Sequence, residues 1–444
     1  MSEKIPKGWK WVKLGEVAKY HFSTNKEEKL NKLVLKNLAK LNFWRVKGMS
    51  EWKEVKLKTI CSDISYGYTA SASKEKVGPK FLRITDITSG KINWDTVPYC
   101  RISEKDYHKY KLSIGDIVIA RTGTLGSSAI IKNDIDAVFA SYLIRFRIDE
   151  KLADPFFISY VLQSQDFKEY VNAVNSGSVQ PGTNARQLGD YELPLPPLPE
   201  QKAIAEVLSS IDDKIDLLHR QNKTLEKIAM TLFKQWFIEP TKDGLPEGWE
   251  ERGLGEIFDY LEGPGIRNWQ YSTRGIPFLN IRLIENGEIN IKNANFISEE
   301  EAFGKYKKFL LQEGDVVIST SGTLGKYAIV RKYHLPLLLN TSIIRFRPKN
   351  KNYRIFMYLY LKSREFKEYL ESSADGSVQA NFGPTHLRAI KIIVPPSHAL
   401  EKFEKIISPL YEKFDNNFFQ IKSLEKLRDT LLPKLMSGEV RVRF

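Results

Sequence analysis

The chain repeats itself, and this repeat constrains the fold more than any other feature of the sequence. The segment GDIVIARTGTLGSSAII (115–131) returns as GDVVISTSGTLGKYAIV (314–330). LIRFR returns as IIRFR, and FKEY and GSVQ each occur twice, all at an offset of 199 or 200 residues. A unit of this length is far longer than the roughly 20–50 residues of a solenoid repeat. We therefore expect one large duplicated module with pseudo-twofold character.

Short apolar runs open each module. Runs that flank a glycine-containing turn predict a β-hairpin in each, formed by Ile117–Ala120 with Ala129–Ile131 and by Val316–Ser319 with Ala328–Val330. A helix is expected after each hairpin, near residues 154–172 and 353–371. Proline segments follow, at Leu193–Pro199 and Val394–Pro396. Because proline fixes φ and lacks an N–H, we interpret them as linkers at domain edges; the alternative is a ligand for an SH3-like domain.

After each proline segment the apolar period becomes helical, with alternating spacings of four and three that are typical of a heptad seam. The first seam comprises Ile204, Leu208, Ile211, Ile215, Leu218, Asn222, Leu225, Ala229, Leu232 and Trp236. The second comprises Phe403, Ile407, Leu410, Phe414, Asn417, Ile421, Leu424, Arg428, Leu431 and Leu435. The pattern favours two long helices that pair antiparallel, since parallel pairing would place both modules at one end; the competing interpretation is core helices of a bundle.

Three seam positions need comment. Asn222 and Asn417 each either fix the register of the pair, as polar seam residues commonly do, or reach solvent at a frayed edge. Pro409 marks either a kink in the second helix or its true first turn.

The net charge of +14 is unevenly distributed over the 444 residues. Residues 1–48 carry +8, so the rest of the chain carries only +6, and the charge is weak evidence for a nucleic-acid partner. The opening of the second module, 245–258, matches both 5–17 and 51–60. The first module thus begins twice. We interpret 1–48 as a poorly ordered relic of a module opening or as upstream sequence, and its charge as a solvated tail rather than a DNA-binding arm.

Several kinds of chemistry are missing from the sequence. Two cysteines, Cys61 and Cys100, exclude a disulfide framework and a four-cysteine zinc site, and the six histidines are scattered. No apolar run reaches the length of a membrane span and no signal peptide is present, so a cytoplasmic, metal-free protein is expected. There is no Pro-Pro-Tyr methyltransferase motif, dinucleotide fingerprint or nuclease pattern, and Gly322–Lys326 lacks the leading glycine of a phosphate loop. A duplicated chain without a catalytic motif is most naturally a two-site binder.

The motifs, in this order and twice, resemble the DNA-specificity subunit of a type I restriction–modification system. The resemblance covers residues 49–444. It is carried by the hairpins GDIVIARTGTLG (115–126) and GDVVISTSGTLG (314–325) and by the segment GSVQPGTNARQLGDYELPLPPLPEQ (177–201). The helix opening EQKAIAEVLSSIDDKID (200–216) and the terminal TLLPKLMSGEVRV (430–442) add to it. Ser397–Glu401 departs from the Pro-Leu-x-Glu-Gln pattern seen at 197–201, which implies a weaker methyltransferase contact for the second helix.

The resemblance implies an α+β fold in which two duplicated α/β target-recognition domains are separated by two long antiparallel coiled-coil helices. The expected divisions begin with an N-terminal extension (1–48), recognition domain 1 (49–199) and spacer helix 1 (200–238). Recognition domain 2 (239–396), spacer helix 2 (397–437) and a tail (438–444) follow. Each domain would read half of a split site in double-stranded DNA. The helices would dock two methyltransferase subunits, and a motor-nuclease restriction subunit would complete the complex. The chain itself would be non-catalytic and bind no cofactor; S-adenosylmethionine, ATP and Mg would belong to partner subunits.

Polar and basic loop residues at predicted strand ends are the candidates for DNA contact. In the first module they are Tyr66, Tyr68, Ser71, Ser73, Lys74, Arg121, Thr122, Thr124, Gln180, Asn184 and Arg186. In the second they are Arg267, Asn268, Tyr271, Arg274, Thr320, Ser321, Thr323, Lys326, Gln379 and Asn381. The variable loops 66–74 and 264–274 are favoured for base contact, whereas the shared GSVQ suits phosphate clamping or the fold.

Four arginines, Arg145, Arg147, Arg345 and Arg347, alternate with apolar residues, which predicts one solvated strand face; the alternative is contact with phosphate. Two other functions stay open at this point. One is a stand-alone DNA methyltransferase or nuclease. The other is a coiled-coil scaffold that binds protein.

Overall fold

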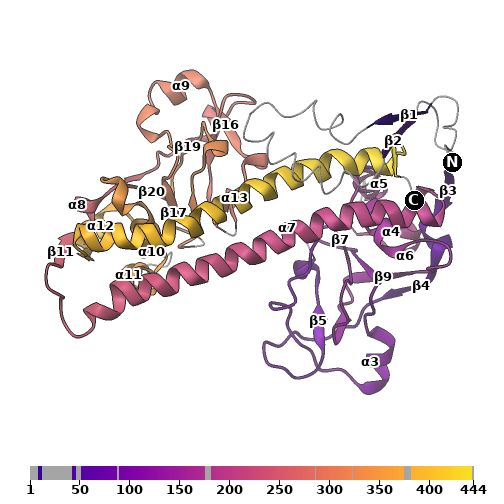
Figure 1. Cartoon of the computed structure of the whole chain (residues 1–444). Coiled ribbons are helices and arrows are strands. Elements are labelled where there is room, and N and C mark those ends of the chain that lie inside the picture. The colour runs from indigo at the N-terminus through magenta and orange to yellow at the C-terminus, as the bar shows by residue number, and fades with distance from the viewer. Residues whose placement is uncertain are drawn as a thin grey trace, which may run out of the picture. The chain divides into compact units, whose positions relative to one another are not determined.

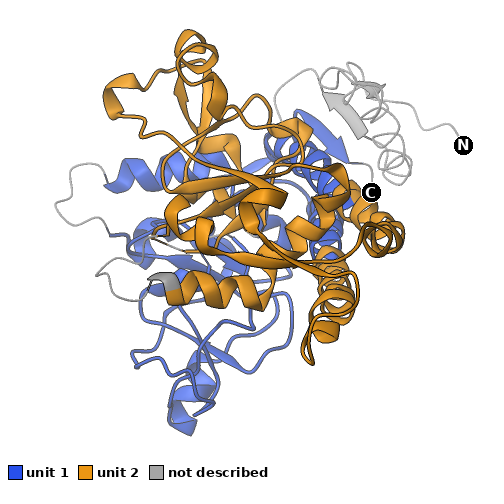
Figure 2. Cartoon of the chain, turned by 90° about the vertical axis from the view of Figure 1, so that its left-hand side faces the viewer, with its two compact units in different colours: residues 1–219, 417–444 blue, residues 220–416 orange. Residues whose placement is uncertain are grey.

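The computed structural model describes residues 9–12, 43–46, 52–87, 90–175, 182–285, 287–322, 324–374 and 382–442. The chain divides into two compact units, one formed by residues 1–219 with 417–444 and the other by residues 220–416 (Figure 2). The division falls within two long helices, α7 (Leu198–Phe233) and α13 (Ser397–Met436). Each unit therefore contains one module and a stretch of both helices.

Unit 1 is built on an antiparallel sheet of four strands in the order β4-β9-β6-β7: Cys61–Tyr66, Leu143–Ile148, Ile117–Ala120 and Ser128–Ile130. A parallel pair, β5 (Lys80–Leu82) with β8 (Ala137–Phe139), extends the module. In Figure 1, β5 and helix α3 (Glu104–Tyr110) lie at the end of the module far from α7. The remaining helices are α4, α5 and α6: Pro155–Val161, Gln165–Asn175 and Ala185–Gly189.

Unit 2 repeats this plan. Its four-stranded sheet has the order β12-β20-β17-β18: Phe258–Glu262, Ile343–Pro348, Val316–Ser319 and Tyr327–Ile329. The second sheet is β16-β13-β19, Asn295–Ile297, Ile276–Leu279 and Leu338–Leu339, and a small hairpin pairs β14 (Ile284–Glu285) with β15 (Glu288–Ile289). Its helices are α8 to α12: Leu254–Ile257, Glu299–Phe303, Arg354–Lys362, Arg364–Ala374 and Pro384–Ala389. The predicted duplication and both predicted hairpins are confirmed.

The helix expected after each hairpin is wrong in one respect: each is two helices. In unit 1 α4 ends at Val161 and α5 begins at Gln165. The hydroxyl of Ser164 accepts a hydrogen bond from the amide of Phe167 at 3.3 Å, which is the N-cap arrangement that starts a new helix. Ser363 does the same for Phe366 at 3.2 Å between α10 and α11. In each unit a capping serine divides the helix, although the apolar pattern continues across it. The apolar pattern alone therefore does not reveal the break.

The first proline segment begins as an edge strand rather than as a linker: β10 (Glu192–Leu195), which contains Pro194, pairs antiparallel with β3 (Lys53–Lys56). In the second module the matching strand β21 (Lys391–Val394) pairs with β11 (Glu250–Gly253) and ends just before Pro395 and Pro396. Proline is tolerated in β10 because a two-stranded sheet leaves one edge of each strand without a ladder partner. α7 then starts at Leu198, directly after the strand.

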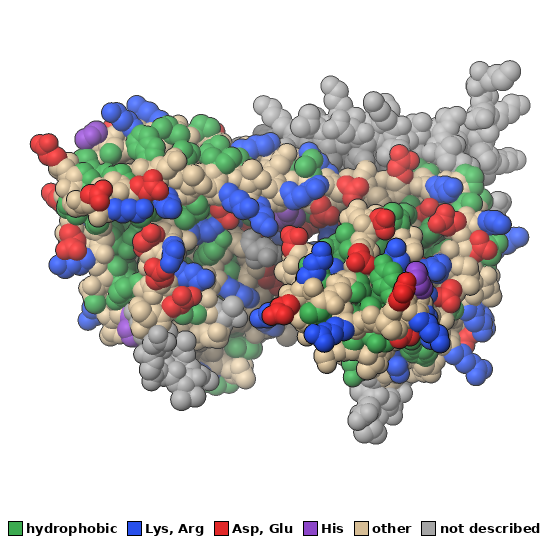
Figure 3. All heavy atoms as spheres, turned by 90° about the horizontal axis from the view of Figure 1, so that it is seen from below, with side chains coloured by type: hydrophobic (Ala, Val, Ile, Leu, Met, Phe, Trp, Pro, Cys, Tyr) green, Lys and Arg blue, Asp and Glu red, His purple; other side chains and the backbone are tan. Residues whose placement is uncertain are grey.

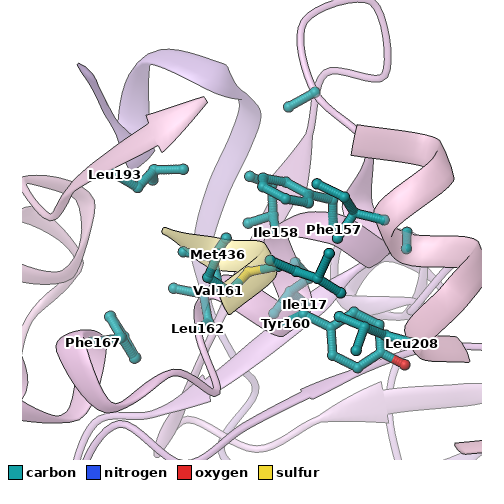
Figure 4. Packing of buried hydrophobic residues seen from close by; sticks show 14 of the residues in the cluster. Ile117, Phe157, Ile158, Tyr160, Val161, Leu162, Phe167, Leu193, Leu208 and Met436 are labelled. Carbon is teal, nitrogen blue, oxygen red and sulfur yellow. The ribbon is translucent and has the colours of Figure 1, made fainter. Parts of the chain in front are cut away.

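In unit 1 the first half of α7 packs against the second half of α13. Ile204, Leu208, Ile211, Ile215 and Leu218 are buried in one cluster with Ile421, Leu424, Leu431 and Leu435. The cluster continues into the module, where Leu208 and Met436 lie beside Ile117, Phe157 and Tyr160 (Figure 4). Arg428 Nη1 of α13 donates to Asp212 Oδ1 of α7 at 3.0 Å. These pairings fix an antiparallel arrangement.

Unit 2 shows the same antiparallel pairing between the second half of α7 and the first half of α13. The ring of Phe237, in the turn of helix (Lys234–Ile238) that follows α7, lies 4.6 Å from the ring of Phe403. Asn222 Nδ2 donates to the carbonyl of Phe414 at 3.4 Å. Asn222 and Asn417 are both buried, so neither reaches solvent at a frayed edge. Leu225 and Leu410 are half-buried, whereas Phe403, Ile407 and Phe414 are buried. α13 begins at Ser397 and continues through Pro409, which is therefore not its first turn.

The strand arginines correct another expectation, because they do not form a solvated face. Arg145 is 5% exposed and donates to Asp63 Oδ2 at 2.7 Å and to the carbonyl of Lys111 at 3.0 Å. Arg147 holds Asp116 through two hydrogen bonds of 2.8 Å. Arg345 and Arg347 repeat these pairings with Asp259 and Asp315. The four side chains are committed to fold-internal ion pairs.

Residues 1–48 lie mostly outside the described residues. The exceptions are strands β1 (Trp9–Val12) and β2 (Phe43–Val46), which pair antiparallel with each other. β2 also pairs with β22 (Val440–Val442), the strand after α13. Arg441 of β22 forms an ion pair with the buried Glu200 of α7. No helix among the described residues is long and apolar enough to span a membrane.

Candidate functional site

The polar loops of each module meet at one edge of its four-stranded sheet, here called the loop edge. β4 and β6 run antiparallel to β9, so their last residues lie beside the first residue of β9. In unit 1 the loop edge comprises the segments 67–79, 121–127 and 140–142. The amide of Gly67 donates to the carbonyl of Leu143 at 3.2 Å, and that of Arg121 donates to the carbonyl of Tyr142 at 3.1 Å. The loops that follow separate strands are thus tied together by their backbones.

A glycine starts the long loop in each module. A Cβ atom on Gly67 would lie 2.2 Å from the carbonyl oxygen of Ala140, and one on Gly263 would lie 2.0 Å from that of Asn340. No side chain tolerates such a distance, so both loops leave the sheet through the same close backbone contact. The two variable loops therefore start from equivalent anchor points although their sequences differ.

In unit 1 Arg121 lies against the ring of Tyr66, and two further predicted residues flank the residue that bonds its hydroxyl. The guanidinium of Arg121 lies 5.0 Å from the centre of that ring, within the range of a cation–π interaction. The hydroxyl of Tyr66 accepts a hydrogen bond from the amide of Ala185 at 3.0 Å. Ala185 lies between Asn184 and Arg186, both exposed, and the Arg186 side chain is 90% exposed. Arg186 is thus open to solvent, whereas the side-chain oxygen of Asn184 caps α6 by accepting from the amide of Gln187 at 2.9 Å.

The other candidates of unit 1 divide into exposed and structural residues. Tyr68 packs against Tyr110, with the ring centres 5.3 Å apart. The hydroxyl of Ser73 accepts from the amide of Glu75 at 3.1 Å. Of the remaining candidates, Ser71, Lys74 and Thr124 are exposed, Thr122 is half-buried, and Gln180 lies outside the described residues.

In unit 2 the loop 263–275 presents Arg267, Asn268 and Arg274 to solvent. It is bound to the loop edge, since the amide of Thr341 donates to the carbonyl of Pro264 at 2.9 Å. Tyr271 is 39% exposed, and its ring lies 5.1 Å from the ring of Phe278. Three of the four candidates in this loop are therefore free of the core.

The hairpin candidates of unit 2 are less available. Thr320 is 3% exposed, and its carbonyl accepts a hydrogen bond from the amide of Phe382 at 3.1 Å. A buried threonine in this position holds the loop edge together and offers no side-chain surface. Ser321 and Lys326 are half-buried, and Thr323, Gln379 and Asn381 lie outside the described residues.

Two exposed aromatic residues at the loop edges were not among the predicted candidates. Tyr142 of unit 1 is 61% exposed and Trp269 of unit 2 is 79% exposed. Both lie beside buried positions in the sequence, Leu143 and Gln270 respectively. An aromatic residue next to buried neighbours is ordinarily assigned to the core, and only the structure shows that these two side chains point outward.

A buried ionic network fixes the module of unit 2 to α13. Arg331 donates to Glu288 Oε2 at 2.8 Å and to Asp415 Oδ1, on α13, at 3.0 Å. His334 Nε2 lies 2.6 Å from Glu288 Oε1. His334 Nδ1 accepts a hydrogen bond from the Arg331 amide at 3.0 Å. Burial raises the pKa of Glu288, but the hydrogen bond from His334 and the charge of Arg331 outweigh it and hold the pKa below its usual value.

The module of unit 1 is joined to α7 by more exposed ion pairs. Lys91 lies 2.7 Å from Asp216, and Lys132 lies 3.4 Å from Asp213. The hydroxyl of Tyr160 donates to Asp212 Oδ2 at 2.8 Å. Asp212 thereby connects α4 to the Arg428 pair that joins α7 and α13. In both units charged side chains join the module to its long helices.

The described residues offer little that could do covalent chemistry. Burial raises the pKa of the Cys61 thiol to about 12 and that of Cys100 to about 11, so both are protonated at neutral pH and are poor nucleophiles. No three His, Cys, Asp or Glu side chains in the described part of the chain come together as metal ligands. Figure 3 shows Lys and Arg interspersed with Asp and Glu on the face in view. What the loop edges offer is exposed hydrogen-bonding and cationic groups on a rigid support.

The chain matches the model of the type I restriction modification DNA specificity domain twice, over residues 6–227 and 246–426. It is 30% identical to the type I restriction enzyme MjaIX specificity subunit of Methanocaldococcus jannaschii, over 88% of this chain and 94% of that protein. It is 25% identical to the HindI specificity subunit of Haemophilus influenzae, over 88% of this chain and all of that protein. The crystal structure of a type I S subunit from M. genitalium shares the fold, with a TM-score of 0.52 and 21% identity over 88% of this chain and 97% of that one.

Proposed function

This chain belongs to the type I restriction modification DNA specificity family, and from that premise we propose how its two modules recognise DNA. It is a specificity subunit with two target-recognition domains, one in each unit. We propose that the loop edge of each domain lies in the major groove of one half of a bipartite site. The first family match begins at residue 6, within the segment 1–48. It does not decide whether that segment is a relic of a module opening or upstream sequence.

The observation that carries this proposal is the equivalence of the two loop edges. Each starts from the same glycine contact and is tied together by the same backbone hydrogen bonds, yet the loops 66–74 and 263–275 differ in sequence. A shared scaffold with different exposed groups suits two readers of different sequences. Arginine recognises guanine, and asparagine or glutamine recognises adenine, through paired hydrogen bonds in the major groove.

Positioning and recognition are separate tasks in such an interface. Exposed cations such as Arg186 and Lys74 suit contacts to phosphate, which supply affinity but no sequence information. We propose that Arg267 and Asn268 of unit 2 contact base edges. We propose that the paired α7 and α13 set the spacing that a split site requires; within unit 2, Arg331 also joins the module to α13 through Asp415.

The partners and cofactors follow the same reasoning. A type I system is a complex, and we propose that this non-catalytic chain binds two methyltransferase subunits along the helices and a restriction subunit beyond them. S-adenosylmethionine, ATP and Mg would then be bound by those subunits, in the cytoplasm where the DNA is. A stand-alone methyltransferase has no support among the relatives, which are named specificity subunits.

Sequencing of DNA methylation in the host, with and without this gene, tests the proposal. We expect one bipartite methylated motif to vanish when the gene is deleted and to return on complementation. The logarithm of the binding constant of the tagged complex for that motif should fall linearly with the logarithm of the salt concentration, with a slope of about −0.9 per phosphate contact. Methylation that is unchanged by the deletion, or methyl transfer by the isolated chain, would contradict it.

A further inference from the structure

The loop 263–275 holds one large apolar side chain away from the protein. Trp269 is 79% exposed, the largest exposed fraction among the large hydrophobic side chains that the structure describes. It is the middle residue of a single turn of 3₁₀-helix, Asn268–Gln270. Leaving this much indole surface in water forgoes the gain of burying it, so its position calls for an explanation.

The residues around Trp269 are anchored, so its exposure is imposed by the fold. Gln270 is 7% exposed, and its Nε2 donates to Glu301 Oε1 at 2.8 Å and to the hydroxyl of Tyr306 at 3.0 Å. Ile266 is 6% exposed, and its amide donates to Asn340 Oδ1 at 3.3 Å. Anchors on both sides of the turn hold the indole at a fixed place on the loop edge.

The charged residues of the loop itself suit a polyanion, and the nearby carboxylate of Glu301 is engaged by Gln270. Residues 263–275 include two exposed arginines, Arg267 and Arg274, and no aspartate or glutamate. An apolar ring in a loop with two arginines suits a partner surface with an apolar group at its centre and negative charges around it. The major groove of DNA is such a surface wherever a thymine places its methyl group between two phosphate backbones.

We propose that Trp269 recognises a thymine methyl group in the half-site read by unit 2. This inference rests on the proposed function and assigns to the second domain a contact that its polar residues cannot make, since neither Arg267 nor Asn268 distinguishes a methyl group. The first domain has no tryptophan in its loop 66–74, and its Tyr68 is packed on Tyr110. The proposed tryptophan contact therefore concerns the second half-site.

Replacement of thymine by deoxyuridine tests the proposal, because it removes only the methyl group. The full chain, purified in its complex, is titrated with duplexes of the mapped site in which each thymine of the second half-site is replaced in turn. We expect one replacement to weaken binding by the wild type about fourfold, the value of one buried methyl-sized group. Trp269→Ala should bind the thymine duplex at least that much more weakly and should lose nothing further on the deoxyuridine duplex.

Phe303→Ala is the matched control, since Phe303 is also exposed, at 49%, and lies in the same unit outside the loop. It should retain the full response to deoxyuridine, and thermal unfolding of both variants should match the wild type. The proposal is overturned if the second half-site has no A·T pair, if no single replacement affects the wild type, or if the wild type and Trp269→Ala lose the same factor. A wild type that does not distinguish the mapped site from scrambled DNA would instead overturn the proposed function.

Discussion

Arg267 shows how much a single exposed residue on the loop edge is expected to decide. Replacing Arg267 or Asn268 with alanine should relax specificity at one position of the second half-site, because a paired hydrogen bond to a base is worth about 1–3 kcal/mol of discrimination. Methylated motifs of the variant strain, compared with those of the wild type, measure this directly.

Lys74→Ala, in the first module, is the control for Arg267→Ala: as a proposed phosphate contact it should lower affinity and leave the sequence read at the second half-site unchanged. A change in both half-sites together would mean that the two domains do not read independently. An even loss of binding on all sequences would make Arg267 a phosphate contact.

Glu288 offers a test of the buried network at the same scale. A carboxyl whose pKa is lower in the folded than in the unfolded protein stabilises the fold fully at pH values above the ordinary, unfolded-state pKa. This stabilisation is lost as the pH falls through the lowered pKa. Glu288→Gln should therefore destabilise unit 2 at neutral pH, by about 3 kcal/mol, as expected when one partner of a buried ion pair is removed. Its deficit relative to the wild type should shrink below about pH 4.5, the ordinary value for glutamate.

Hydrogen exchange of β15 and of the turn Lys332–His334 measures this local stability. The control is Glu285→Gln, an exposed glutamate on the neighbouring strand, which should have little effect. If the deficit of Glu288→Gln were constant from pH 7 to pH 3, the charge of Glu288 would not be the source of its contribution.

The strand arginines show why residue-level roles are hard to predict from sequence. Arg145 and Arg147 alternate with buried residues, a pattern that is typical of a strand with one solvated face. Their partners, Asp63 and Asp116, lie 82 and 31 residues away along the chain. Nothing local marks those pairings, and the same is true of Gln270, whose burial depends on Glu301 and Tyr306. The role of the strand arginines was misjudged because it depends on such distant partners.

At the scale of the element, the pairing of α7 with α13 can be tested by two adjacent leucines. Leu218 is 1% exposed and Leu217 is 39% exposed. Leu218→Glu should lower stability by several kcal/mol, because it buries a charge without a partner. Leu217→Glu makes the same chemical change on the solvent side and should be nearly neutral. Thermal unfolding and binding to the mapped site are the measurements.

Ile215→Glu should behave as Leu218→Glu does, since Ile215 is also buried at 2%. If either Ile215→Glu or Leu218→Glu unfolded cooperatively at the wild-type temperature and bound the site fully, the assignment of these residues to the α7–α13 seam would be refuted.

Elements were predicted well where the signal is local. The hairpins follow from apolar runs that flank glycine turns, and the long helices follow from the heptad period. The proline segment was misjudged because whether an extended segment is a linker or a strand depends on its partner. That partner, β3, lies about 140 residues earlier in the sequence of unit 1. The break at Ser164 was missed because a capping serine does not change the spacing of the apolar residues from which the helix was predicted.

For the whole molecule, we predict that deletion of residues 1–48 leaves assembly and sequence specificity unchanged. β3 already pairs with β10 as β11 pairs with β21, so the first module is complete without the earlier opening. The methylated motif and the affinity at physiological salt should match those of the full chain.

Deletion through residue 56, which removes β3, is the control for this truncation and should destabilise unit 1. If removal of 1–48 alone lowered DNA affinity tenfold, the segment would be a functional basic arm. If it lowered stability instead, the pairing of β2 with β22 would be structurally necessary.

The division into units has a consequence for the order in which the protein forms on the ribosome. Residues 220–416 are continuous, so unit 2 can fold once they have emerged, whereas unit 1 needs residues 417–442 as well. At about 5–20 residues per second, the apolar face of α7 that ends at Leu218 waits roughly 10–40 seconds for its partner helix. During synthesis, that face is a ready target for chaperones and a point of vulnerability when translation stalls.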